Sequence, residues 1–306
     1  MNNVKIMTHR LTINTMFIQM VLVSVIWGGT FIAGRILQPE IPPLLSATVR
    51  FIFAAISLVL LLTVTRLGWK KVTLNQFLQI MVLGVSGVFI YQVLFFYGLQ
   101  IIPASRAALL VAINPAMIAL IAFLLWREKI TLTKGVGIAF CVIGAVVLLS
   151  NKAAEADGFL TNKGDLAILG CVISWGIYTV AGKRVIREIG ALHTVTYAIL
   201  LGTFLLVVAS LFTQTLTLDN FALFSFYDLL SLAYLGILGS AIAYVWYYQG
   251  VDQLGAASAG SFIALNPLTA VLIGSLFLDE NINTIVFAGG AMVILGILIT
   301  NRKNKA

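Results

Sequence analysis

The sequence predicts an all-α membrane protein, with ten transmembrane helices arranged as two inverted five-helix repeats. Three observations support this fold class: few charges, apolar stretches long enough to cross a bilayer, and one stretch that occurs twice. The 306 residues are 60% hydrophobic and 10% charged, and the mean hydropathy is +1.05. Soluble domains carry about 25% charged residues. We therefore expect the lipid bilayer to be the main partner of this chain.

Ten apolar stretches follow one another along the chain, each near the ~20 residues that cross a bilayer at ~1.5 Å per residue. The first follows a basic start with Lys5 and Arg10. It is too long for a signal peptide and has no small-residue cleavage site, so we expect it to be retained. The expected helices span 14–36, 44–65, 75–97, 104–126, 132–150, 165–186, 194–213, 228–249, 256–278 and 283–300.

The distribution of basic residues predicts the orientation. With a cytoplasmic N-terminus, 14 of the 19 Lys and Arg residues fall on the cytoplasmic side and three fall outside. Because basic loops stay cytoplasmic, both termini are expected inside a bacterial-type inner (plasma) membrane. The same rule explains the net charge of +8. No basic and aromatic surface motif indicates a nucleic-acid partner.

A helix interrupted by an Asn-Pro pair occurs twice, at Asn114-Pro115 and at Asn266-Pro267. Proline removes one backbone hydrogen bond and crowds the carbonyl four residues back. Lipid satisfies neither this carbonyl nor the asparagine, so this face must meet protein or water. We interpret both prolines as hinges. The asparagines either contact a substrate or join helices by polar contacts, and the sequence leaves both possibilities open.

The two Asn-Pro pairs belong to a longer internal repeat. Pairing residues 84–144 with 236–296 at a shift of 152 gives 18 identities in 61 positions, and earlier in the chain the shift is 148. The repeats are expected at 14–150 and 164–300. Five helices in each unit turn the second copy upside down in the membrane. Inverted repeats with broken helices are the layout of secondary transporters.

The motifs of both units resemble the drug/metabolite transporter superfamily, specifically its ten-helix EamA-like family, over about residues 18–300. They are Trp27-Gly28, Ala33-Gly34-Arg35, Val49-Arg50-Phe51, and Asn114-Pro115 followed by Arg127-Glu128-Lys129-Ile130. The resemblance implies alternating access round a cavity between helices 1, 3, 4, 6, 8 and 9 of the ten. It also implies a small-molecule substrate, with export of amino acids or related metabolites as the first expectation. Arg106 departs from the pattern, which has a small or polar residue there.

Aromatic and polar side chains recur on matched helical faces of the two units. Trp27 and Thr30 share one face, and Trp175 and Tyr178 share the corresponding one. The third and eighth expected helices add further rings and hydroxyls, from Tyr91, Phe95, Tyr244, Tyr247 and Tyr248. Together with Asn114 and Asn266, these side chains predict an aromatic-lined substrate site with a few polar groups. Packing alone is the alternative explanation of such a stripe.

Arg50 lies about two turns into the second expected helix, where a charge at mid-membrane costs about 2.5–3.5 kcal/mol on insertion scales. It either extends outward to the interface or lines the outer vestibule, and we favour the vestibule. No nucleotide loop, metal-ligand cluster or nucleophile–base arrangement occurs in the sequence, so we expect no cofactor, metal or catalytic residue. Cys141 and Cys171 are interpreted as packing residues.

Two other functions compete with this interpretation. A lipid-modifying membrane enzyme needs a cluster of His, Asp or Glu at one interface, and the sequence shows none. A proton-coupled multidrug exporter of the same fold needs a buried titratable group. Carboxylates such as Glu128 and Glu280 stand only at the edges of the expected helices. We therefore expect transport without proton coupling. The identity of the substrate, the direction of transport and the oligomeric state stay open.

Overall fold

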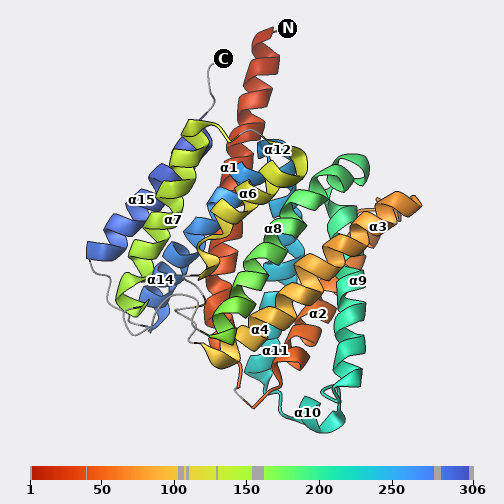
Figure 1. The fold of residues 1–306 in the computed structure, drawn as a ribbon. Helices are drawn as coiled ribbons and strands as arrows, with labels where there is room; N and C mark the ends of the chain where they lie inside the picture. The colour runs from red at the N-terminus through yellow and green to blue at the C-terminus, as the bar shows by residue number, and fades with distance from the viewer. Residues whose placement is uncertain are drawn as a thin grey trace.

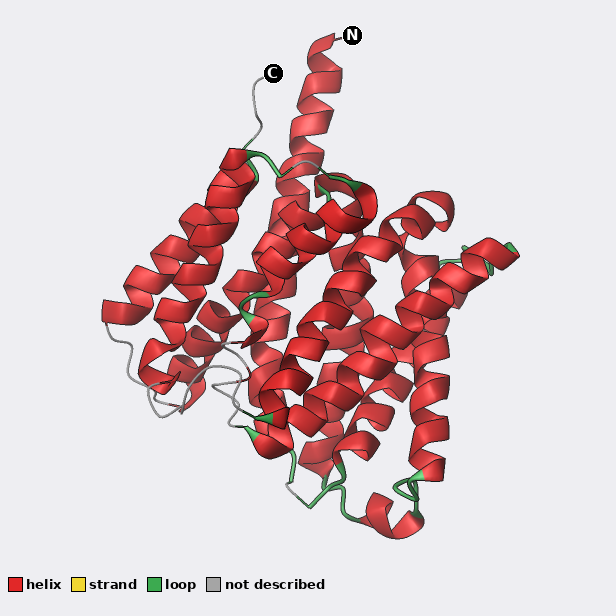
Figure 2. Cartoon of the chain, in the orientation of Figure 1, coloured by secondary structure: helices red, strands yellow, loops and turns green. Residues whose placement is uncertain are grey.

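The chain forms a helical bundle in a computed structural model, which describes residues 2–38, 40–102, 107, 110–128, 130–153, 162–278 and 284–302 (Figure 1). Within these residues the elements are helices joined by short loops, without a strand (Figure 2). The start of the first helix and the end of the last one lie at the same end of the bundle. This all-helical architecture confirms the predicted fold class in its coarse form.

The helices of the first half, up to residue 153, are α1 (Asn2–Ile36), α2 (Pro43–Val64), α3 (Leu74–Leu83), η1 (Gly84–Ile90), α4 (Tyr91–Ile101), α6 (Asn114–Trp126) and α7 (Leu132–Ala153). Those of the second half are α8 (Lys163–Ile189), α9 (Ala191–Phe212), α10 (Leu218–Ala222), α11 (Phe226–Gly236), η2 (Ile237–Ile242), α12 (Ala243–Leu254), α13 (Ala256–Ser261), η3 (Phe262–Ala264), α14 (Leu265–Leu278) and α15 (Thr284–Thr300).

Many of these helices are long and apolar enough to cross a membrane. Seven described segments meet both conditions: Thr15–Gly34, Pro43–Val64, Leu74–Gly98, Lys163–Ile189, Ala191–Phe212, Phe226–Leu254 and Ala256–Ile273. Three shorter apolar helices accompany them: Asn114–Trp126, Leu132–Val147 and Phe287–Thr300. The chain is therefore a multi-pass membrane protein.

Two of the long helices contain a π-helical segment at matched positions. The segment η1 joins α3 to α4 without a break, and η2 joins α11 to α12 in the same way. A π segment adds a residue to a turn and frequently marks a functional site. The positions of η1 and η2 differ by about the 152 residues that relate the two repeats. The π segment therefore belongs to the repeated unit.

Glycines carry reciprocal contacts between the two halves. A side chain on Gly84 would collide with the backbone of Ala198 in α9, and one on Gly236 would collide with the backbone of Arg50 in α2. Ala198 is the counterpart of Arg50 at the shift of 148, as Gly236 is of Gly84 at the shift of 152. The contact between Gly84 and α9 and the contact between Gly236 and α2 are therefore the same contact made from each half. A twofold relation between the halves requires such pairs.

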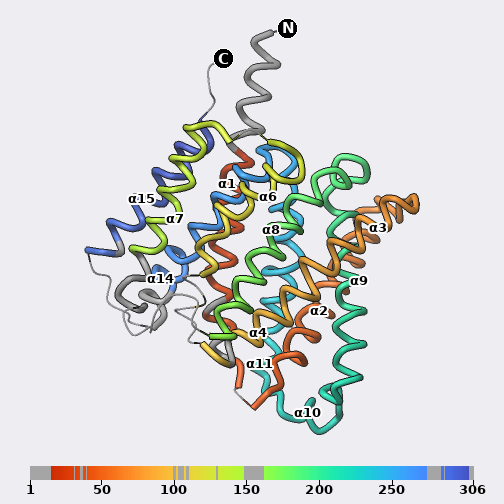
Figure 3. The backbone as a smooth tube through the Cα atoms, viewed as in Figure 1, coloured from red at the N-terminus to blue at the C-terminus, as the bar shows by residue number. Residues whose placement is uncertain are grey.

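The last helices of the two halves, α7 and α15, run side by side (Figure 3). A side chain on Gly144 would collide with the carbonyl oxygen of Gly289, and one on Gly296 would collide with that of Gly137. The shift of 152 residues converts the first of these contacts into the second, because Gly296 corresponds to Gly144 and Gly289 corresponds to Gly137. Small residues let helix backbones approach closely where lipid supplies no hydrophobic driving force.

Candidate functional site

The helices that carry the two Asn-Pro pairs change their winding at these pairs. In the first half α6 begins at Asn114, after a tight turn in which Ile113 N donates to Leu110 O at 3.2 Å. In the second half the 3₁₀ segment η3 separates α13 from α14, which carries Asn266 in its first turn. Proline has no backbone N–H to donate, which explains why the helical winding changes at both Asn-Pro pairs.

Both asparagines are buried and incompletely satisfied. Asn114 is 2% exposed and Asn266 is 8% exposed. The Oδ1 atom of each has no hydrogen-bond partner in the part of the chain that the structure describes. Buried polar atoms in native proteins are nearly always paired, so each unpaired oxygen calls for an explanation. An acceptor kept open for a ligand is one explanation that suits matched positions in both repeats.

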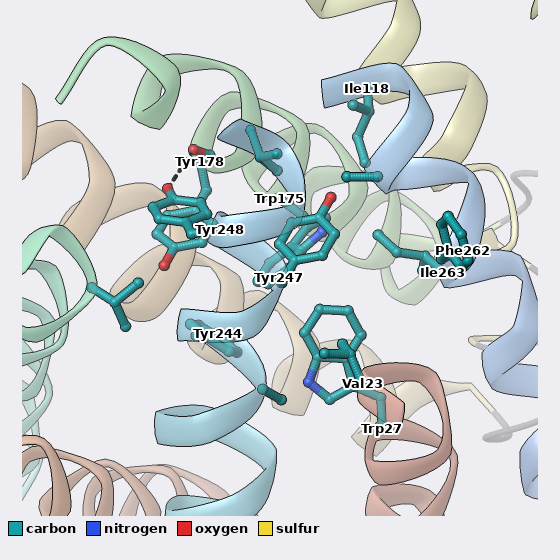
Figure 4. Close-up of a cluster of buried hydrophobic side chains, with 14 of the residues drawn as sticks. Val23, Trp27, Ile118, Trp175, Tyr178, Tyr244, Tyr247, Tyr248, Phe262 and Ile263 are labelled. Atoms are coloured by element: carbon teal, nitrogen blue, oxygen red, sulfur yellow. Dashed lines mark hydrogen bonds between the residues drawn. The ribbon is translucent and has the colours of Figure 1, made fainter. Parts of the chain in front are cut away.

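A cluster of aromatic rings lies where α1, α4, α8 and α12 meet (Figure 4). We define the central ring cluster as Trp27, Tyr91, Trp175, Tyr178, Tyr244, Tyr247 and Tyr248. Trp175 is its middle, because its ring centroid lies 5.5 Å from that of Trp27 and 5.2 Å from that of Tyr244, both in edge-on geometry. Ring pairs in this range attract beyond the area that they bury.

Tyr178 and Tyr248 are fixed by stacking and by a hydrogen bond. The rings of Tyr178 and Tyr248 stack at 4.6 Å, and the Tyr248 hydroxyl donates to Tyr178 O at 2.7 Å (Figure 4). On the opposite side Tyr91 lies 5.6 Å from Trp175 and stacks on Phe95 at 5.8 Å. Rings from both halves of the chain therefore form one continuous group.

The two matched tryptophans differ in their hydrogen bonding. Trp27 Nε1 donates to Gly239 O at 2.9 Å, a carbonyl of the π segment η2. Trp175 Nε1 is buried and makes no hydrogen bond of full geometry among the described residues, although the Tyr247 hydroxyl lies near enough to interact with it. The Tyr178 hydroxyl is also buried without a partner in the same set. Within the described part of the cluster, the polar atoms without a full hydrogen bond thus belong to Trp175 and Tyr178, both of the second repeat.

Apart from Tyr91, which is half-buried, the central ring cluster is closed in this conformation. Trp27 is 8% exposed, and the exposed fractions of Trp175 and Tyr244 are smaller. Tyr247 is fully buried, and its hydroxyl lies 3.2 Å from Thr179 Oγ1. A ligand would reach these rings only after the helices that bring them together have parted.

Arg50 adds a positive charge beside the cluster. Its Nε donates to Ser240 Oγ of η2 at 2.9 Å, and its Cζ lies 5.5 Å from the centroid of the Phe51 ring. No carboxylate of the described residues lies within 4.0 Å of the guanidinium. The structure therefore places, at the edge of the rings, an arginine that has no acidic partner in the described part of the chain.

Two described carboxylates near helix ends, Glu128 and Asp228, are engaged in structural contacts. Glu128 follows α6 and forms an ion pair with Lys183 of α8. Asp228 closes the capping box at the start of α11, and its Oδ1 accepts from the backbone N of Gln38 at 3.0 Å. Glu280 and Arg106 lie outside the described residues.

The structure brings together most of the side chains predicted for the site. Phe95 joins the cluster through Tyr91, and Thr30 lies beside Gly239 of η2. The candidate residues that lie together in the central ring cluster are Trp27, Tyr91, Trp175, Tyr178, Tyr244 and Tyr248. Asn114 and Asn266 stand instead at the two helix breaks, whose helices contact each other through α6, α13 and η3.

Two polar residues near the site are absent from the sequence-based prediction. Gln92 is fully buried, and both polar atoms of its amide lack a partner among the described residues. Ser240 is fully buried and accepts from Arg50. The repeat register offered a signal for Gln92, because a shift of 152 makes it the counterpart of Tyr244. No comparable signal indicates Ser240.

Comparison with known proteins gives consistent matches. A model of the EamA-like transporter family matches residues 14–150 and 162–302. The uncharacterized transporter YyaM of Bacillus subtilis is 30% identical over 285 residues, covering 92% of this chain and 92% of that protein. A protein of Streptantibioticus cattleyicolor, named a probable terminal-alkyne amino-acid exporter, is 29% identical over 237 residues, covering 78% of this chain and 77% of that protein.

A solved crystal structure shares the fold. It superposes with a TM-score of 0.79 at 18% identity, and the match covers 94% of this chain and 97% of the other. At this identity the match supports the architecture and not the activity.

Proposed function

The chain belongs to the EamA-like transporter family, and from this premise we propose that it moves small organic metabolites across the membrane by alternating access. The family and the named relatives are transporters, so the chain is not an enzyme. The observation that carries the proposed mechanism is the central ring cluster, to which both repeats contribute matched residues such as Trp27 and Trp175. Sites built between repeats at mid-membrane are typical of secondary transporters.

The proposed membrane arrangement has ten crossing helices and an inverted second repeat. Seven long and three shorter apolar segments support the number, and the reciprocal glycine contacts support a twofold relation between the halves. The start of α1 and the end of α15 lie at the same end of the bundle, as the proposed cytoplasmic placement of both termini requires. The excess of basic residues assigns that end to the inside of a bacterial-type inner membrane.

The proposed substrates are amino acids or related compounds, and the proposed direction is export. Rings with a few hydroxyls and amides suit a molecule with an apolar part and a few polar groups. The relative named a probable terminal-alkyne amino-acid exporter supports this class.

Alternating access would work by rocking of the two repeats round the closed cluster. Parting the halves on one side would separate Trp27 from Trp175 and admit the substrate. The breaks at Pro115 and Pro267 would absorb the change in backbone angles, since broken helices bend more easily than continuous ones. The engagement of Glu128 with Lys183 supports transport without proton coupling.

Flux in proteoliposomes tests the proposal. Purified wild-type protein should carry one or more radiolabelled amino acids with saturable kinetics above empty liposomes. Trp175→Ala should lower that flux at least about tenfold, because it removes the middle of the cluster. Phe123→Ala is the matched control, since Phe123 is 49% exposed on the outside of α6. Absence of wild-type flux, or equal flux of both variants, would contradict the proposal.

Alternating access needs its own measurement. A single cysteine at Thr30, in a chain without Cys141 and Cys171, should react with a membrane-impermeant thiol reagent from either side in turn. Substrate should slow the reaction from both sides. Reaction from one side only, under every condition that changes the substrate gradient, would contradict a site that opens alternately.

A further inference from the structure

Arg50 is held beside the central ring cluster by one side-chain hydrogen bond among the described residues and by its position over the Phe51 ring. Its Nε donates to Ser240 Oγ at 2.9 Å, and Ser240 in turn donates to Leu235 O at 3.0 Å. Its Nη2 lies 4.0 Å from the point where a side chain on Gly239 would begin. Gly239 is also the residue whose carbonyl accepts from Trp27. The terminal nitrogen of Arg50 therefore lies near the residue whose carbonyl anchors the first ring of the cluster.

The guanidinium keeps most of its donors free. Arginine has five N–H donors, and the structure uses only the one on Nε for a hydrogen bond within the described residues. Two nitrogens in a planar fork thus remain. This fork matches the two oxygens of a carboxylate and forms the stronger class of hydrogen bonds.

The fold itself does not call for this charge. The counterpart of Arg50 in the second repeat is Ala198, which packs against Gly84 as the backbone of Arg50 packs against Gly236. The reciprocal helix contact therefore works with an alanine. A cation in a membrane-spanning helix marks a functional site by default, since insertion opposes it.

We propose that Arg50 is the carboxylate-binding residue of the substrate site. The proposed ligand is a small carboxylate with an apolar part, whose two oxygens take the free Nη donors while the apolar part packs on the rings. Ser240 is a positioning residue, because it fixes the Nε side of the fork and leaves the other side open. This assignment rests on the proposed function, since it names the substrate class of the same site.

The ligand chemistry has two sources, a zwitterionic amino acid and a simple monocarboxylate. Phenylalanine, 3-phenylpropanoate and phenylalaninamide separate them, because the first two carry a carboxylate and the first and third carry an amino group. Binding is measured on the purified full-length protein in detergent by the change in tryptophan fluorescence. Trp27 and Trp175 lie in the cluster and should report a ligand there.

Wild-type protein should bind phenylalanine about 10- to 100-fold more tightly than phenylalaninamide, the range of a charge-assisted pair. Arg50→Gln should remove that preference by weakening only the carboxylates, and Arg50→Lys should restore part of it. Arg184→Gln is the matched control, since Arg184 pairs with Glu188 on the surface. Equal binding of 3-phenylpropanoate and phenylalanine would assign the site to monocarboxylates in general, which also supports the proposal.

The overturning results are distinct from a failure of transport. A wild type that shows no preference for carboxylate over carboxamide overturns the assignment without the need for any variant. Equal weakening of all three probes by Arg50→Gln overturns it too, because that pattern indicates a structural role. Carboxylate-dependent binding without flux in proteoliposomes would leave the Arg50 site standing and reject the transport proposal instead.

Discussion

Replacing each of the two matched tryptophans by phenylalanine should have unequal effects on stability. Trp27 and Trp175 are both nearly buried and lose the same ring atoms, so the packing cost largely cancels between them. Trp27→Phe also removes the donor to Gly239 O, while Trp175→Phe removes an N–H that has no acceptor among the described residues. The free energy of unfolding should therefore fall further for Trp27→Phe.

The size of this difference follows from the hydrogen bond. A typical internal hydrogen bond contributes about 0.5–1.5 kcal/mol, and a buried acceptor left without a donor costs up to about 3 kcal/mol. We expect Trp27→Phe to be about 0.5–3 kcal/mol less stable than Trp175→Phe. Unfolding of both purified variants in the same detergent, followed by circular dichroism, measures it.

Transport should show the opposite order. The Nε1 of Trp175 makes no full hydrogen bond among the described residues and can serve a substrate, so Trp175→Phe should lower flux more than Trp27→Phe does. Equal loss of stability in the two variants, or a greater loss for Trp175→Phe, would show that the hydrogen bond from Trp27 to Gly239 contributes nothing measurable. The difference in hydrogen bonding between the matched positions would then have no energetic meaning.

Three further predictions concern the site, the topology and the coupling. Asn114→Ala and Asn266→Ala should each lower flux, and the double variant should lose less than the sum of the two free-energy changes, as expected for one shared event; full additivity would indicate two separate structural roles. A cysteine at Lys71 should resist a membrane-impermeant thiol reagent in intact cells, and one at Asp219 should react, because α10 lies at the opposite end of the bundle from the termini; the reverse pattern would invert the proposed orientation. Flux should not depend on an imposed pH gradient, because Glu128 is engaged with Lys183; accumulation that needs the gradient and disappears in Glu128→Gln would reject uncoupled transport.

Local chemistry made several features predictable from the sequence. Because proline lacks a backbone N–H, the helices that carry Pro115 and Pro267 change their winding beside these two prolines. The internal repeat was readable because duplicated glycines kept their register. The structure gives Gly84 and Gly236 matching contacts across the two halves. Apolar length and low charge predicted a multi-pass helical protein, and the family membership is confirmed by the match over both repeats.

Other features depend on which groups meet across the two repeats. The sequence placed Trp27 and Trp175 at equivalent positions, yet only the tertiary structure shows that Trp27 donates to Gly239 and that Trp175 makes no full hydrogen bond within the described residues. The π segments η1 and η2 were invisible as well, because a single added residue in a turn leaves the apolar pattern intact.

The sequence by itself determined the class, the repeat, the helix breaks and the candidate side chains, because composition, proline chemistry and register are local or periodic properties. Only the tertiary structure decided which partner each polar side chain has. Arg50 shows the reason. Its spacing along α2 fixes its position on that helix, but the contact with Ser240 and the absence of an acidic partner within the described residues depend on a segment 190 residues away. Hydrogen bonds and ion pairs act over a few ångströms, so they follow the distance between atoms in space and not their separation along the chain.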